Sequence, residues 1–205
     1  MASKLFDEVT KMVATTELKN KFKKVIGALT GNENFTDVYV PRMAYIQTTA
    51  KTITNTTTET TLFNDTGAIG SRTIAKNTLR KGSLIRIHLL SDLTNVSNPT
   101  NVIKIKIGDT TIITSSAQLG TNATSVLGEL YLELLVTTEG ASGKIGGQGF
   151  TKVVGGTNPV RNLMLTTPTD FNTTVDNELD VTYTWDAASE SNIVVCTNAT
   201  IEVVQ

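Results

Sequence analysis

The chain has 205 residues, which is long enough for one substantial hydrophobic core and an accessory segment but too short for two large domains. Charged residues make up 18% of it and the net charge is -1, so the composition excludes a strongly basic nucleic-acid-binding protein and a highly charged disordered chain. A single cysteine, Cys196, excludes an intrachain disulfide framework, and a single histidine, His88, excludes a zinc site built from several Cys and His ligands.

The first residues contain no apolar core of signal-peptide length, and no apolar run approaches the roughly 20 residues that cross a bilayer. We therefore expect a protein that is made in the cytoplasm, binds no nucleic acid and does not insert into a membrane. A single cysteine does not indicate whether the protein is found in an oxidising or a reducing compartment.

Residues 1–47 predict a short N-terminal α-helical arm followed by a connector. Apolar residues recur there at intervals of four, three and four, which places one apolar stripe along a helix. The stripe consists of Leu18, Phe22, Val25 and Leu29. An earlier stripe of Leu5, Val9 and Met12 is out of register with it, which indicates two short helices or a stutter. So narrow a stripe needs a partner to cover it.

Residues 38–60 predict extended chain. In the segment 38–46, Pro41 favours an edge strand or an irregular arm because proline cannot donate a backbone hydrogen bond. Residues 48–60 are dominated by threonine, whose β-branching disfavours a helix, and we interpret them as a neck or first strand. The chain is thus divided into an arm and connector at 1–47, the Thr-rich segment at 48–60 and a β-sandwich domain at 61–205.

From Leu62 onward the apolar residues alternate with polar ones, which predicts strands with one buried and one solvated face. In 103–107 the isoleucines share one face and the lysines the other, and Gly108-Asp109 predicts a hairpin turn into 110–113. The same alternation marks 130–136 and 175–185, and shorter candidate strands lie at 84–90, 160–165, 193–196 and 200–204. Many short strands without interleaved helices favour an antiparallel, jelly-roll-like sandwich over an α/β sheet.

Three features could carry chemistry or bind phosphate, and each has a simpler structural interpretation. His88 shares a strand face with Arg86, and no nucleophile or orienting carboxylate lies near it in sequence, so we interpret it as a strand-face histidine. Cys196 ends an apolar strand and is expected to be a buried, inert thiol. The glycine-rich run 140–149 does not match a phosphate-binding loop, and we interpret it as a flexible strand connection.

Acidic residues gather near the C-terminal end of the chain. Alternation places Asp176, Glu178 and Asp180 on one strand face, which fits either a solvated face or a cation site, such as a calcium site, at a subunit junction. A carboxylate pair of a glycoside hydrolase is a further alternative.

Two stretches resemble a domain that recurs in tailed-phage virion proteins, among them head fibres, decoration proteins and fibre-like appendages. The first, 61–83, contains Gly67-Ala68-Ile69-Gly70 and then Asn77-Thr78-Leu79-Arg80-Lys81-Gly82, similar to that domain's opening turns. The second, 171–192, contains the strand that ends at Trp185, followed by a small-residue loop and Asn192. One departure is Ala75-Lys76 after Ile74, where a proline is common.

The resemblance implies a jelly-roll-like, homotrimeric virion component that is not an enzyme and has no cofactor. It would be made in the host cytoplasm and incorporated into the virion as a head fibre or decoration protein. Leu18, Phe22, Val25 and Leu29 would then serve oligomerisation, as in a three-stranded coiled coil, or anchoring on capsid or other virion proteins. An ordinary amphipathic helix covering its own sandwich is the alternative for this segment.

Two other functions remain open from the sequence. In the first, the chain is a receptor- or carbohydrate-binding module of a tail appendage, whose loops at 139–149 or 186–192 contact a host-surface glycan. In the second, it is a glycan hydrolase that uses the acidic cluster or His88. Only 5% of the chain is aromatic, which weakens the glycan-binding interpretation because sugar sites favour exposed aromatic rings.

Overall fold

The computed structural model describes residues 41–96, 99–118, 124–154 and 160–204, and every helix or strand among them is a β-strand. The predicted N-terminal helical arm, with Leu18, Phe22, Val25 and Leu29, lies outside the described residues and stays a prediction. Within the described part of the chain, no helix is long and apolar enough to cross a membrane.

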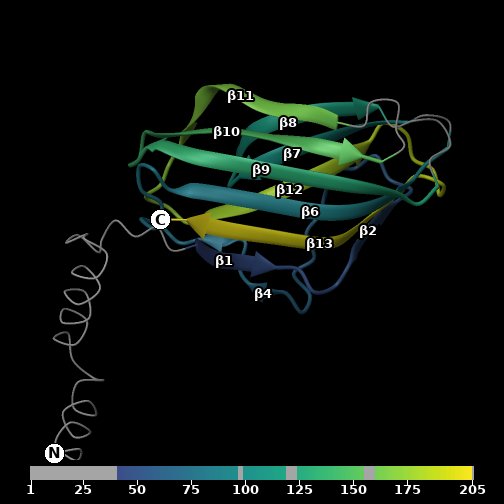
Figure 1. Ribbon diagram of the computed structural model, residues 1–205, viewed down its shortest axis with the longest axis horizontal. Helices are drawn as coiled ribbons and strands as arrows, with labels where there is room; N and C mark the ends of the chain where they lie inside the picture. Colours follow the sequence, from purple (N-terminus) through teal and green to yellow (C-terminus); the bar gives the residue numbers. More distant parts are fainter. Residues whose placement is uncertain (1–40, 97–98, 119–123, 155–159, 205) are drawn as a thin grey trace, which may run out of the picture. The chain divides into compact units, whose positions relative to one another are not determined.

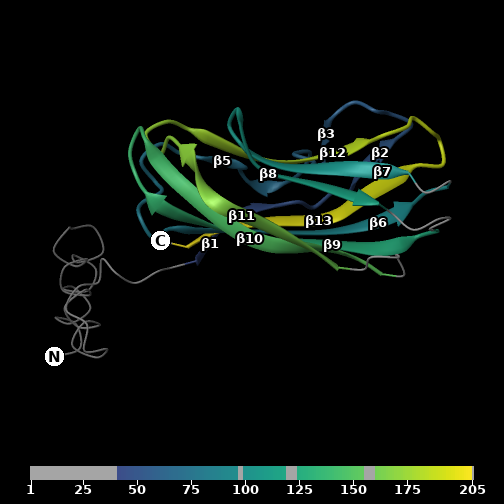
Figure 2. The same ribbon diagram turned by 90° about the horizontal axis from the view of Figure 1, so that it is seen from above.

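The strands form two sheets that lie one above the other in Figure 2. The larger sheet faces the viewer in Figure 1 and contains, in spatial order, β11 (Val160–Phe171), β10 (Gly143–Val153), β9 (Val126–Thr138), β6 (Leu84–Thr94), β13 (Ile193–Val204), β1 (Pro41–Ile46) and β4 (Ile69–Gly70), with β2 (Lys51–Thr54) also paired to β13. The smaller sheet contains β3 (Thr60–Thr61), β12 (Asn177–Trp185), β7 (Thr100–Ile107) and β8 (Thr110–Gln118), with β5 (Thr73–Ile74) paired to β12.

The core lies between these sheets and is built from the apolar halves of the alternating strands. Strand β9 contributes the buried side chains of Leu130, Leu132, Leu134 and Val136, and β12 contributes those of Leu179, Val181, Tyr183 and Trp185. All strand pairs are antiparallel. The predicted mainly β, antiparallel sandwich is therefore confirmed. Two sheets are needed because each strand has one apolar face, which a second sheet must cover.

The hairpin predicted around Gly108 is confirmed. Strands β7 and β8 pair with Ile107 opposite Thr110, and Gly108 has a φ of 55°, a left-handed conformation that glycine adopts without steric cost. Ile105 and Ile107 are almost completely buried, whereas Lys104 and Lys106 are partly exposed on the opposite face.

The connector and the Thr-rich segment contribute strands to the large sheet. Pro41 is the first residue of β1, where a missing N–H is tolerated, and Ile53 of β2 is buried. Both β1 and β2 pair with β13, on the side opposite to β6. Residues 41–54 therefore form part of the sheet, and the boundaries proposed for the three segments stay a prediction.

The connections resemble those of a jelly roll only in part. Consecutive strands change sheets at every step from β2 to β7, and again between β8 and β9, β11 and β12, and β12 and β13. In contrast, β9, β10 and β11 follow one another as neighbours within the large sheet, as in a meander.

The glycine-rich run is not a flexible connection, and that interpretation was wrong for residues 143–149. These residues begin β10, which pairs with both β9 and β11. The glycines allow a close approach of the two backbones: a Cβ on Gly149 would collide with the Tyr131 carbonyl oxygen, and one on Gly147 would collide with a Leu134 methyl carbon. From the sequence alone, a run of glycines predicts a loop. Only the position of the neighbouring strand β9 shows that these glycines are needed for close packing.

We predict that Gly149→Ala lowers the free energy of unfolding by about 1–3 kcal/mol, because the new methyl group forces β9 and β10 apart. The matched control is Gly146→Ala in the same strand, where the nearest atom to the added methyl group, in Pro168, is 3.8 Å away. Urea unfolding should show a change within about 0.5 kcal/mol for the control. Equal destabilisation by both substitutions would contradict the close packing at Gly149.

Candidate functional site

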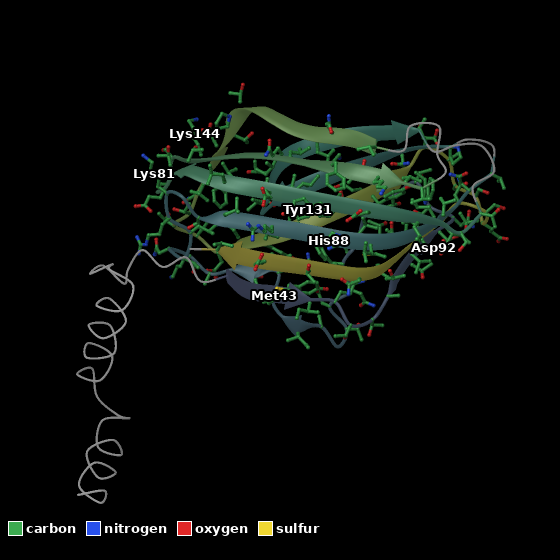
Figure 3. The ribbon with its side chains drawn as sticks, viewed as in Figure 1. Met43, Lys81, His88, Asp92, Tyr131 and Lys144 are labelled. Carbon is green, nitrogen blue, oxygen red and sulfur yellow. The ribbon has the colours of Figure 1, made fainter. Side chains whose placement is uncertain are left out.

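The outer face of the large sheet carries a row of aromatic rings that cross three strands. His88 of β6 lies opposite Tyr131 of β9, and Tyr131 lies opposite Phe150 of β10. Ring centroids are 6.1 Å apart for His88 and Tyr131 and 6.0 Å apart for Tyr131 and Phe150. Figure 3 shows His88 and Tyr131 side by side on this face. We call the outward-facing side chains of β10, β9, β6, β13 and β1 the large-sheet face.

Ion pairs adjoin the aromatic row. The Arg86 guanidinium donates from Nε to Glu133 Oε1 at 2.9 Å and from Nη1 to Glu202 Oε2 at 3.2 Å. The Tyr131 hydroxyl donates to the same Glu133 oxygen at 2.9 Å. Arg86, followed by Tyr131, holds the pKa of the Glu133 carboxyl below its usual value. The charges of β6, β9 and β13 are thus paired within one chain.

His88 contacts a carboxylate on the same face. Its Nε2 lies 2.9 Å from Glu129 Oε1, and the imidazole is about one-third exposed on the strand face. Among the described residues, no Ser, Thr or Cys side chain forms a hydrogen bond with His88. A Ser–His or Cys–His pair of the kind that acyl transfer uses is therefore not observed at His88 among the described residues.

The acidic strand face of β12 is occupied by an arginine of the same chain. Arg72 lies within ion-pair distance of Asp65, Glu178 and Asp180, at 2.8, 2.7 and 3.6 Å. It also donates to the Leu179 carbonyl oxygen, and its guanidinium lies 5.3 Å from the centre of the Phe63 ring. The sequence left two alternatives for this strand face, a solvated face or a cation site. In the structure, the cation beside these carboxylates is the Arg72 side chain.

Asp176 does not take part in the ion pairs with Arg72. Its carboxylate accepts a hydrogen bond from the backbone N–H of Lys76 at 2.8 Å. Among the described residues, no group of three or more His, Cys, Asp or Glu side chains is placed to hold a metal ion. The hydrogen bond from Arg72 holds the pKa of Asp65 below its usual value, although partial burial opposes this shift.

A second ionic cluster lies on the outer side of the small sheet. Glu59 accepts hydrogen bonds from Lys104, Lys106 and the Thr182 hydroxyl. These contacts, led by the one from Lys104, lower the pKa of Glu59 to about 2. The lysines that alternate with isoleucines in β7 therefore stabilise the chain segment before β3, which the sequence could not show because Glu59 is distant along the chain.

Cys196 is fully buried, as expected from the apolar strand around it. Burial raises the pKa of its thiol to about 11, so the reactive thiolate is scarce at neutral pH. The interior beside it holds a cavity of about 50 Å³ that is lined largely by apolar side chains, among them Leu89, Leu93 and Val194. That volume admits water molecules and is well below the roughly 300 Å³ of ordinary ligand pockets.

The structure brings together residues that sequence analysis treated separately. Arg86 and His88 share a face, as predicted, but their partners Glu129, Glu133 and Glu202 come from other strands. Alternation could assign each of these side chains to an outward face, and only the strand register shows which ones meet. The glycan-contacting loop expected at 139–149 is largely strand β10.

Comparison with known proteins found no matching family and no matching curated protein. Among solved structures, the chain is similar to the CBM2 module of the evolved Dit of Lactobacillus casei BL23 phage J-1. That match has 8% sequence identity and a TM-score of 0.37, and it covers 80% of this chain and 96% of that one.

We predict that Arg72→Leu lowers the free energy of unfolding by about 1–3 kcal/mol at pH 7, because it leaves three carboxylates close together without a cation. The pKa of Asp65 is lowered in the folded state, so the stabilisation is complete above the pKa of the unfolded chain, near 4, and is lost as the pH falls through the folded value. The difference from wild type should therefore shrink as the pH approaches 3.

Urea unfolding at pH 7, 5 and 3 measures this effect. Arg72→Lys is the matched control, since it keeps the positive charge but loses the paired hydrogen bonds to Asp65, and it should recover part of the loss. A difference between Arg72→Leu and wild type that is constant from pH 7 to pH 3 would show that packing of Arg72, and not its charge, is responsible.

Proposed function

We propose that this protein is a non-enzymatic structural component of a tailed-phage virion, of the head-fibre or decoration class. In this proposal the N-terminal arm anchors the protein on capsid or other virion proteins, and the sandwich forms a homotrimer that is displayed outward. The proposal starts from the two sequence stretches that resemble such virion domains, at 61–83 and 171–192.

The observation that carries the proposal is the position in the fold of the glycine, asparagine and tryptophan residues on which this resemblance rests. Gly67, Gly70, Asn77 and Gly82 of the first stretch all have positive φ values, between 59° and 91°. In the second stretch, Trp185 and Asn192 are buried. The shared residues are thus the ones that determine turn geometry and core packing, which supports a common domain type over a chance match of small residues.

The arrangement of ionisable groups agrees with a structural role. The carboxylates around Arg72, Arg86 and Lys104 are held in ion pairs on sheet faces. Asp65 and Glu178 line a pocket of about 170 Å³, but there Arg72 pairs with both carboxylates, whereas a catalytic carboxylate must reach a substrate.

A receptor- or carbohydrate-binding module of a tail appendage is the second candidate, and one observation favours it. The row formed by His88, Tyr131 and Phe150 presents aromatic rings beside carboxylates on a broad sheet face, and sugars bind by stacking and hydrogen bonding of this kind. A glycan array on the full chain tests this candidate. Binding that Tyr131→Ala abolishes would favour it over the structural role.

The structural proposal is tested on purified particles of the phage that encodes the chain. We predict that replacing Leu18, Phe22 and Val25 together by Ser reduces the amount of this protein in the particles at least about tenfold, since the apolar stripe contacts the virion. The melting temperature of the sandwich should stay unchanged. Quantitative mass spectrometry of the particles measures the first effect, and circular dichroism measures the second.

The control for the arm is Lys19→Ser combined with Lys23→Ser, which changes the same segment outside the apolar stripe and should leave incorporation unchanged. Electron microscopy with a gold label on the wild-type chain should show the label at regular positions on the particle surface. Absence of the wild-type protein from the particles would refute the proposed function.

A further inference from the structure

The core at one end of the sandwich contains polar side chains without a hydrogen-bond partner. Asn101 is the first inward residue of β7 and is 2% exposed, and Trp185 lies directly opposite it in β12. The oxygen and nitrogen of the Asn101 carboxamide, Trp185 Nε1 and the Tyr183 hydroxyl form no hydrogen bond with any group in the described part of the chain. Buried polar groups in folded proteins are nearly always hydrogen-bonded, so these groups need a partner that the described residues do not supply.

Two of these residues line the interior cavity of about 50 Å³ between the sheets. Asn101 and Tyr183 line it from the small sheet, and Ser91, Gly128 and Thr151 line it from the large sheet. Both Asn101 and Tyr183 are almost completely buried, so bulk solvent does not satisfy their polar atoms. The cavity is therefore the place where a partner for these side chains can lie.

The cavity exists because the large sheet carries small residues at this end. Ser91 and Gly128 lie opposite each other in β6 and β9, whereas the other inward positions of these two strands carry leucine, isoleucine or valine. A Cβ on Gly128 would lie 2.5 Å from Ser91 Oγ, so the serine side chain reaches over the glycine. Figure 3 marks this end of the sandwich at Asp92, which follows Ser91 in β6. Space that a larger apolar side chain would fill therefore stays open opposite the polar groups of the small sheet.

The described residues that line the cavity place no charged group inside it. Glu129 and Lys152 belong to the lining, but strand alternation points their side chains outward, where Glu129 contacts His88. Burial raises the pKa of the Tyr183 hydroxyl well above its usual value and that of the Cys196 thiol to about 11, so both groups are uncharged at neutral pH. An ion would lie there without a counter-charge, which is costly in an apolar interior, and the occupant must therefore be neutral.

The unpaired groups require an occupant that both donates and accepts hydrogen bonds. The Asn101 carboxamide offers one acceptor oxygen and two N–H donors, and the Tyr183 hydroxyl can donate and accept. Ser91 and Thr151 bring further hydroxyl groups from the opposite sheet. A water molecule needs roughly 10–15 Å³ of such a cavity, so a volume of about 50 Å³ accommodates about three to five of them. Water thus has the right size, the right charge and both hydrogen-bonding roles.

We propose that this cavity is an internal hydration site, in which ordered water molecules connect Asn101 and Tyr183 of the small sheet to Ser91 and Thr151 of the large sheet. At this end of the sandwich the sheets are then linked by hydrogen bonds through water, whereas direct apolar packing joins them along the rest of the described core. Such bridging waters satisfy buried polar groups and are costly to remove. The inference concerns the fold and does not depend on the virion role.

The test uses the full chain and counts the water molecules in this cavity. A crystal structure that shows ordered water should place about two or more of them within about 3.2 Å of the polar atoms of Asn101 and Tyr183. In solution, magnetic relaxation dispersion of oxygen-17 in water counts the molecules that stay inside the protein. Asn101→Leu, which replaces the carboxamide by an apolar group of similar size, should lower that count by about two or more, because the apolar cavity stays dry.

A second variant, Tyr183→Phe, serves in case Asn101→Leu impairs folding, since it removes only a hydroxyl group and keeps the ring against Trp185. It should lower the count by about one. The matched control is Ile105→Val, which changes the core of the same strand β7 outside the cavity lining and should leave the count unchanged. Circular dichroism checks that each variant is folded.

Three results would overturn the inference. The first is a dry cavity in the wild-type crystal structure, with the Asn101 carboxamide hydrogen-bonded to another protein group. The second is a water count that both Asn101→Leu and Tyr183→Phe leave unchanged while the proteins stay folded, which would place the internal water elsewhere. The third is electron density for a larger solute, such as an alcohol or a polyol, which would assign the cavity to that class of ligand.

Discussion

The central position of β13 is the constraint on which the rest of the structure depends. This strand pairs with β6 along its whole length on one side and with β1 and β2 on the other. Because its inward side chains, such as Val194, Ala199 and Ile201, are fully buried, a shift of β13 by one residue would turn its own core face outward. The C-terminal residues therefore fix the register of the segment at 41–54, far away in sequence.

The same register determines the chemistry of the surface. Antiparallel pairing places Glu202 and Glu133 beside Arg86, so that this cation has partners from both neighbouring strands, and it places the Tyr131 ring beside His88. On the other sheet, Arg72 forms ion pairs with Glu178 and Asp180 of the acidic strand β12. In the described part of the chain, the outer side of the small sheet carries ion pairs, whereas the large-sheet face carries the exposed apolar side chains of Met43, Leu90 and Leu135.

Sequence analysis predicted the architecture well where the apolar period is regular. The alternation in 103–107 and 130–136 placed the correct residues in the core, because a strand with one apolar side must bury that side. It failed for 143–149, where glycine signalled a loop but the close contact with Tyr131 and Leu134 required the absence of a side chain. It also assigned Val175 to a strand face, whereas this residue precedes β12 and is about half exposed.

The sequence by itself determined that the chain from Leu62 onward forms antiparallel strands around one core, that Cys196 is buried, and that His88 and Arg86 share a face. These properties follow from local alternation, which each strand carries in its own residues. Only the tertiary structure decided which strands are neighbours, and therefore which charges meet, which glycines lie against another backbone and which outer face keeps exposed apolar side chains. Such contacts depend on the register between different strands, and the local pattern within one strand contains no information on that register.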